Sequence, residues 1–140
     1  MEVLCQAETN LQLVVERFEQ CDFKLTELTH ARHLTVATYY LTRFSFDEAQ
    51  ARMRIGLQHF IAHHSKQGYH ETITRFWMEL IARFLTTVRE NVSIAENVNE
   101  VISRYGTKDI LFEYYTRERV MSEIARCEWI EPDLKPLPGN

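Results

Sequence analysis

Apolar side chains recur every three or four residues over most of this 140-residue chain, which is the spacing of one face of an α-helix. No stretch alternates between apolar and polar residues as a half-buried strand does. The broadest apolar face belongs to the fourth segment, which we expect at the centre of the core. The pattern predicts seven helical segments, at roughly 9–20, 26–43, 45–64, 70–89, 93–105, 108–114 and 117–127.

Two serines mark helix starts within this pattern. Ser45 and Ser93 are each followed three residues later by glutamate, and this spacing is typical of a capping box. The connections at 44–46 and 65–69 are short, which favours antiparallel packing of the helices that they join. Local signals therefore predict both where helices begin and which ones are neighbours.

We predict an all-α fold: a single-domain, mostly antiparallel bundle of about five to seven helices. The helical domain spans 1–131. The last residues, 132–140, contain three prolines, so they form an extended C-terminal tail. We expect Trp129, Leu134 and Leu137 to lay this tail over the bundle.

Composition narrows the possible partners. The formal charge is −4 and basic residues are dispersed among acidic ones, which argues against nucleic acid and anionic membranes. No 18-residue stretch is free of charge, so a membrane span is not expected. Cys5, Cys21 and Cys127 lack metal-binding spacing and indicate reduced thiols in a soluble, cytoplasmic protein. The oligomeric state is left open.

Three histidines stand where a helical protein would normally place apolar side chains. His30 and His33 each lie four residues before a member of the apolar stripe of the second segment, Leu34 and Ala37, and His70 begins the fourth segment. An unpaired polar group on an inward face is costly, so these imidazoles are expected to have a partner or a purpose. Because helices two and four should run parallel, the histidines, with His64, would gather at one end of the bundle.

One version of this site binds a divalent transition metal through His30, His33 and His70. Imidazole is a common metal ligand, and a His-x-x-His spacing presents two nitrogens on one helical face. A fourth position would then hold water, as catalytic sites require. The zinc-protease spacing is absent, and the single Glu27-x-x-His30 pair lacks the second copy that a di-iron bundle needs.

The other version is metal-free. His30 or His70 would act as a general acid or base near neutral pH. Glu27 or Glu71 would orient the imidazole, and the hydroxyl of Thr72 or Thr74 would assist. Both versions predict a small-molecule enzyme or binding protein with a small-molecule ligand in an internal pocket. The alternative is a non-catalytic helical interaction module in which the histidines only fasten helix starts to neighbouring carbonyl groups.

Three blocks of the chain carry a resemblance: Leu28–Leu34, Gly68–Trp77 and Trp129–Pro138. Together they resemble a family of small, uncharacterised helical proteins of bacteria with looser relatives in fungi, over about residues 10–138. The shared T-H-x-x-H-L and Y-H-x-T-x-T blocks contain the histidines described above. The resemblance therefore implies a common site around these histidines, but no substrate.

Overall fold

The computed structural model describes residues 8–139, and within this range it contains α-helices and short 3-10 helices but no strand. The predicted all-α fold is confirmed. In chain order the elements are α1 (Glu8–Glu19), η1 (Leu25–Glu27), α2 (His30–Arg43), α3 (Phe46–His63), α4 (Glu71–Leu85), α5 (Ile94–Tyr105), η2 (Lys108–Ile110), α6 (Leu111–Tyr114), α7 (Arg117–Val120) and α8 (Glu123–Cys127).

The predicted boundaries are wrong in three places. The second helix begins at His30 rather than near residue 26, since Leu25–Glu27 forms the separate 3-10 helix η1. The fourth helix ends at Leu85 rather than near residue 89. The last predicted helix, 117–127, is divided into α7 and α8. The division has a local cause, because the Ser122 hydroxyl accepts a hydrogen bond from the Ala125 amide at 3.2 Å and so caps a new helix.

The two predicted capping boxes differ in completeness. Ser93 and Glu96 form both reciprocal bonds at the start of α5. At the start of α3, the Ser45 hydroxyl accepts from the Glu48 amide at 3.2 Å. The Glu48 carboxylate, however, lies one turn further on, 3.0 Å from Arg52. This i,i+4 ion pair competes with the return bond to the serine amide.

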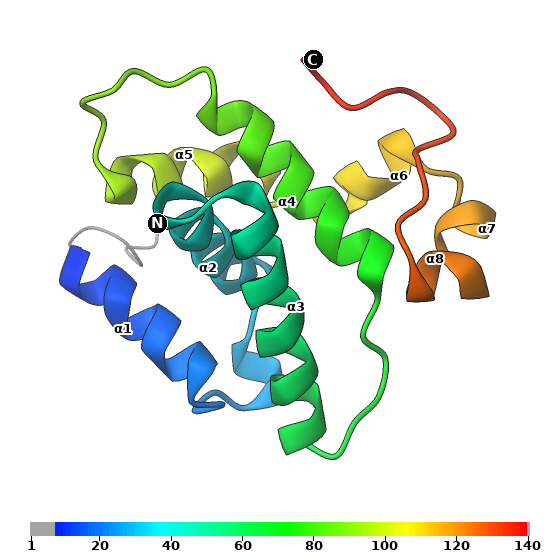
Figure 1. The fold of residues 1–140 in the computed structure, drawn as a ribbon, viewed down its shortest axis with the longest axis horizontal. Coiled ribbons are helices and arrows are strands. Elements are labelled where there is room, and N and C mark those ends of the chain that lie inside the picture. Colours follow the sequence, from blue (N-terminus) through cyan, green and yellow to red (C-terminus); the bar gives the residue numbers. More distant parts are fainter. Residues whose placement is uncertain (1–7, 140) are drawn as a thin grey trace.

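Helix α2 occupies the middle of the molecule, with α1, α3, α4 and α5 packed around it (Figure 1). Five consecutive residues, from Leu34 to Thr38, are buried, so no face of the helix is left to solvent over that length. The hydroxyls of Thr35 and Thr38 donate to the carbonyls of Ala31 and Leu34, each at 2.8 Å. These polar side chains are thus satisfied within their own helix, which permits their complete burial.

Helix α4 joins two hydrophobic clusters. Ile81 and Phe84 belong to the main cluster around α2, whereas Phe76 and Leu80 belong to a second cluster formed with the C-terminal helices. The half-buried ring of Trp77 packs against both. The central position therefore belongs to α2, and α4 connects the main bundle to the helices that follow α5.

The segment after α8 runs along the C-terminal helices. Its backbone is held by the Leu134 amide, which donates to the Tyr114 carbonyl at 2.8 Å, and by Arg83, which donates to the Pro138 carbonyl at 3.1 Å. Trp129 and Leu137 pack against the second cluster as expected. Leu134 does not, since its side chain is exposed.

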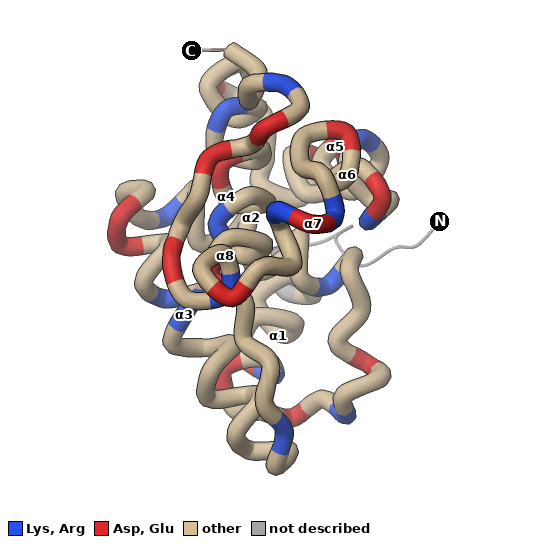
Figure 2. Tube along the Cα trace, turned by 90° about the vertical axis from the view of Figure 1, so that its right-hand side faces the viewer, with Lys and Arg blue, Asp and Glu red and all other residues tan. Residues whose placement is uncertain are grey.

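Acidic and basic positions are interspersed over the face shown in Figure 2, in keeping with the small formal charge of −4. Within the described part of the chain, no helix has both the length and the hydrophobicity that crossing a bilayer requires. Cys21 is buried and Cys127 is exposed, and neither forms a disulfide. The predicted thiol Cys5 lies outside the described residues.

Thr72 fastens the start of α4 to the chain that follows α8. Its buried hydroxyl donates to the Glu128 carbonyl at 2.8 Å and accepts from the Ile130 amide at 3.2 Å. We expect Thr72→Val to lower the free energy of unfolding by about 1 to 3 kcal/mol, because both backbone groups lose their partner. The Ile130 amide should also exchange its hydrogen faster.

Thr42→Val provides the control for this prediction. The Thr42 hydroxyl is exposed and donates only to the Tyr39 carbonyl of its own helix, at 2.9 Å. Its loss should change stability by no more than about 0.5 kcal/mol in denaturant unfolding. Equal effects of the two substitutions would show that Thr72 does not hold the C-terminal segment.

Candidate functional site

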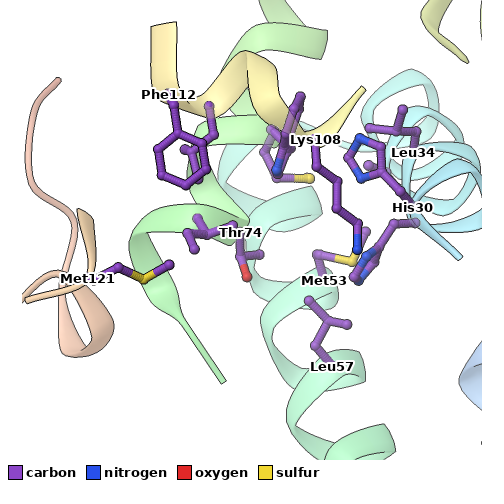
Figure 3. Close-up of a pocket in the computed structure, with 14 residues that line it drawn as sticks. His30, Leu34, Met53, Leu57, Thr74, Lys108, Phe112 and Met121 are labelled. Atoms are coloured by element: carbon purple, nitrogen blue, oxygen red, sulfur yellow. The ribbon is translucent and has the colours of Figure 1, made fainter. Parts of the chain in front are cut away.

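A pocket of about 340 Å³ lies between α2, α3, α4 and the helices after α5 (Figure 3). Each element contributes side chains at helical spacing, so that one face of each helix forms one wall. The lining residues are His30, His33, Leu34 and Ala37 from α2, Met53 and Leu57 from α3, Ile73, Thr74, Trp77 and Met78 from α4, and Lys108, Leu111, Phe112 and Met121 from the C-terminal part. The pocket is thus mainly apolar, with a few polar groups.

His33 is the most unusual of these polar groups. Its Nε2 atom is buried and has no hydrogen-bond partner among the described residues. Burial, together with the positive charges that His30 and Lys108 can carry, lowers the pKa of His33 from 6.5 to about 4. The imidazole is therefore neutral at pH 7, and its Nε2 atom is enclosed and unpaired in the wall of the pocket.

His30 lies one turn before His33 and is better satisfied. Its Nε2 donates to the Tyr105 carbonyl at 3.0 Å, at the end of α5. Its ring meets Trp77 edge-on, with 4.6 Å between the ring centroids. Burial lowers the pKa of His30, although the Tyr105 carbonyl opposes this shift. His30 thus joins α2 to α5 and also forms part of the pocket wall.

His70 does not line the pocket. It is the N-cap of α4: its Nδ1 accepts from the Ile73 amide at 3.1 Å, and its Nε2 donates to the Val120 carbonyl at 2.8 Å. Both ring nitrogens are occupied by backbone groups, and burial lowers the pKa of the imidazole. The geometry therefore gives His70 a structural place, fastening α4 to α7, rather than the expected place beside His30 and His33.

Glu71 is likewise directed away from the pocket. Its carboxylate accepts from Arg54 at 3.0 and 2.8 Å and from the Tyr69 hydroxyl at 2.7 Å. The Arg54 guanidinium lowers the pKa of Glu71. Thr74 does line the pocket, and its hydroxyl lies near that of Tyr69. Of Glu71 and Thr74, only Thr74 is placed to touch a bound molecule.

Glu27 and His64 form hydrogen bonds to backbone groups outside the pocket. The Glu27 carboxylate accepts from the Lys24 amide at 2.8 Å and caps η1, so it does not orient His30. His64, expected at the same end of the bundle, donates to the Phe23 carbonyl at 2.9 Å. Both side chains fix the turn between α1 and α2 instead of contributing to the pocket.

The three-histidine metal site has no counterpart in this geometry. Among residues 8–139, no group of three or more histidine, cysteine, aspartate or glutamate side chains is placed to hold a metal ion. His30 and His33 share one pocket wall, while His70 faces α7. The metal-dependent version stays a prediction, and the described residues do not form the metal site that it requires.

The opposite wall of the pocket was missed by sequence reasoning. Lys108, Leu111 and Phe112 follow one another at i, i+3 and i+4, a spacing that places them on one face of η2 and α6. Met121 reaches the pocket from the junction between α7 and α8, and about 47% of it is exposed (Figure 3). The spacing of the first three was visible in the sequence. That they face α2 depends on long-range packing.

Comparisons of this chain with protein-family models, with curated proteins and with solved structures find no match. The function is therefore argued from the pocket itself.

The depressed pKa of His33 predicts a pH-dependent stability. The unfolded chain binds a proton near pH 6.5 and the folded protein only near pH 4, so stability falls as the pH drops through this window. Wild type should lose free energy of unfolding between pH 7 and pH 5, and we expect this loss to be about 2 kcal/mol smaller in His33→Leu. Denaturant unfolding at both pH values measures this difference.

His59 supplies the matched control, since it is an exposed histidine on α3. His59→Gln should keep the full loss of stability on acidification. If His33→Leu behaves as His59→Gln does, then His33 is not held neutral in the folded protein, and the description of its environment is wrong.

Proposed function

We propose that this protein binds a small, largely apolar molecule in the pocket, and that His33 meets a polar atom of that molecule. One observation carries the proposal: a buried imidazole nitrogen without a partner at the wall of a mainly apolar cavity. The volume of about 340 Å³ lies at the small end of ligand pockets, which span about 300 to 1,000 Å³. A short chain or a single ring fits this size.

The cost of His33 supports a ligand rather than a structural role. A buried polar group without a partner costs about 1 to 3 kcal/mol, and native proteins contain few of them. His64 and His70 show what structural histidines look like in this chain, because their Nε2 atoms reach backbone carbonyls. A bound molecule would give His33 the partner that the protein itself does not supply.

The same geometry is compatible with acid–base chemistry. The low pKa keeps the His33 imidazole neutral at pH 7, which is the form that can accept a proton from a bound substrate. His30 stands one turn away, and Thr74 offers a hydroxyl from α4. In an enzymatic version we therefore place His33 at the reacting group, with His30 and Thr74 as its neighbours.

The alternative is a helical interaction module. It has some support, since His64, His70 and Glu27 all serve the backbone, and Ile55 and Ile124 are exposed apolar side chains. Scattered apolar residues are, however, normal on protein surfaces. The interaction-module hypothesis also does not explain why the Nε2 atom of His33 is buried without a partner. Binding in the pocket is therefore the better explanation.

A cytoplasmic location belongs to the same proposal. The thiols of Cys21 and Cys127 are both free, which is typical of proteins in a reducing compartment. A small-molecule ligand would then come from the metabolites of that compartment.

Trp77 reports on the pocket directly, because it lines the cavity and only one other tryptophan is present in the chain. In a Trp129→Phe protein, Trp77 is the sole tryptophan. We expect 1-hexanol, a small apolar probe with one hydroxyl, to change its emission in a saturable way and to raise the melting temperature, since a ligand bound only by the folded state stabilises it.

The Trp77→Phe protein, which keeps Trp129 outside the pocket, is the control. Its emission should not respond to 1-hexanol over the same concentrations. A response of equal size in both proteins would mean that the probe binds elsewhere, and no saturable response in either would contradict the proposed pocket.

A further inference from the structure

The titratable side chains around the pocket are all basic. His30, His33 and Lys108 line it, and no aspartate or glutamate is among its lining residues. The two carboxylates expected nearby are turned away, Glu27 toward the Lys24 amide and Glu71 toward Arg54. The site therefore offers hydrogen-bond donors and positive charge, but no counterion of its own.

Lys108 places its charge at the mouth of this pocket. The residue lies at the start of η2 and is exposed, and its side chain extends along the pocket (Figure 3). Among the described residues no carboxylate forms an ion pair with it. Its charge acts instead on the two imidazoles, since it lowers the pKa of both His30 and His33. Because burial disfavours protonation of both imidazoles, the Lys108 ammonium is the charged group of the pocket lining, and it has no counterion among the lining residues.

The direction of α2 adds to the same preference. His30 is the first residue of this 14-residue helix and His33 lies in its first turn. The amino end of a helix carries partial positive charge, which favours an anion and disfavours a protonated imidazole. Helix, lysine and imidazoles therefore all favour negative charge at the same corner of the pocket.

We propose that the molecule bound in the pocket is a small monocarboxylate. Its carboxylate lies between Lys108 and His33, accepting a hydrogen bond from the Lys108 ammonium and one from His33 Nε2. Its hydrocarbon part extends along the apolar walls, where Leu57, Ile73 and Trp77 provide contact surface. A carboxylate has only acceptor oxygens, which matches the donors present. This inference rests on the proposed function, since it names the ligand class of the same pocket.

Three six-carbon probes that differ only in their head group test the charge preference. Hexanoate, 1-hexanol and hexylamine are titrated into the Trp129→Phe protein at pH 7 while the emission of Trp77 is followed. We expect hexanoate to bind about tenfold more tightly than 1-hexanol, because charge-assisted hydrogen bonds are stronger than neutral ones. Hexylamine should bind more weakly than either.

Lys108→Met keeps most of the side-chain length and removes the charge from an exposed position, so the fold is not at risk. In this variant the affinity for hexanoate should fall about tenfold, while that for 1-hexanol should stay the same. Lys66→Met, at an exposed lysine in the connection between α3 and α4, is the control with equal net charge and should leave both affinities unchanged.

The outcomes separate the two proposals. Binding of 1-hexanol with no preference for hexanoate would overturn the carboxylate while leaving the pocket proposal standing. A hexanoate preference that survives Lys108→Met, or that is lost equally in Lys66→Met, would also overturn the carboxylate site described here. Saturable binding of none of the three probes would overturn both proposals.

Discussion

Burial of α2 on all sides is the constraint on which the rest of the structure depends. A helix surrounded by four others cannot carry a charged side chain along its middle, because a buried charge without a partner is strongly destabilising. The chain meets this constraint with an uncharged stretch from Leu34 to Thr42. Its threonines turn their hydroxyls back to their own helix. Charged and titratable side chains stand toward the ends of α2, and at its amino end these are His30, Arg32 and His33.

Helix α4 extends this arrangement to the second cluster and thereby closes the pocket. Side chains at its start hold the C-terminal part of the chain by hydrogen bonds to backbone groups. His70 bonds to Val120, and Thr72 bonds to Glu128 and Ile130. These bonds fix the position of α7 and α8 against α4. The outer wall of the pocket, including Met121, is consequently positioned by polar contacts that lie outside the pocket. His70, which the sequence analysis assigned to the chemistry of the site, thus helps to hold the pocket wall in place from outside the pocket.

Local signals in the sequence were sufficient for most of the fold. The reciprocal box at Ser93 and the period of the apolar residues predicted α5 correctly, because these features depend only on residues within one or two turns. The division of α7 from α8 was missed although Ser122, a good N-cap, stands at the break. Leu134 was expected to be buried, but only its backbone is engaged.

The site was predictable only in part, since spacing gives the face of a helix but not what that face meets. His30 and His33 both line the wall that α2 contributes to the pocket. The same reasoning could not show that Val120 would take the nitrogen of His70, or that Arg54 would take the carboxylate of Glu71. Lys108 was not predicted because only the folded chain brings the start of η2 to the same pocket as His30 and His33. Each of these contacts joins residues 17 or more positions apart.

The central claim is that His33 is neutral, buried and without a protein partner until a molecule enters the pocket. Side-chain ¹⁵N nuclear magnetic resonance of the histidine rings measures this most directly. At pH 5.5 the His33 ring should give the signal of a neutral imidazole, because its pKa is lowered to about 4. Addition of hexanoate should then shift the His33 Nε2 resonance and leave the resonances of the exposed His59 ring unchanged. A His33 ring that is protonated at this pH and does not respond to hexanoate would contradict the claim.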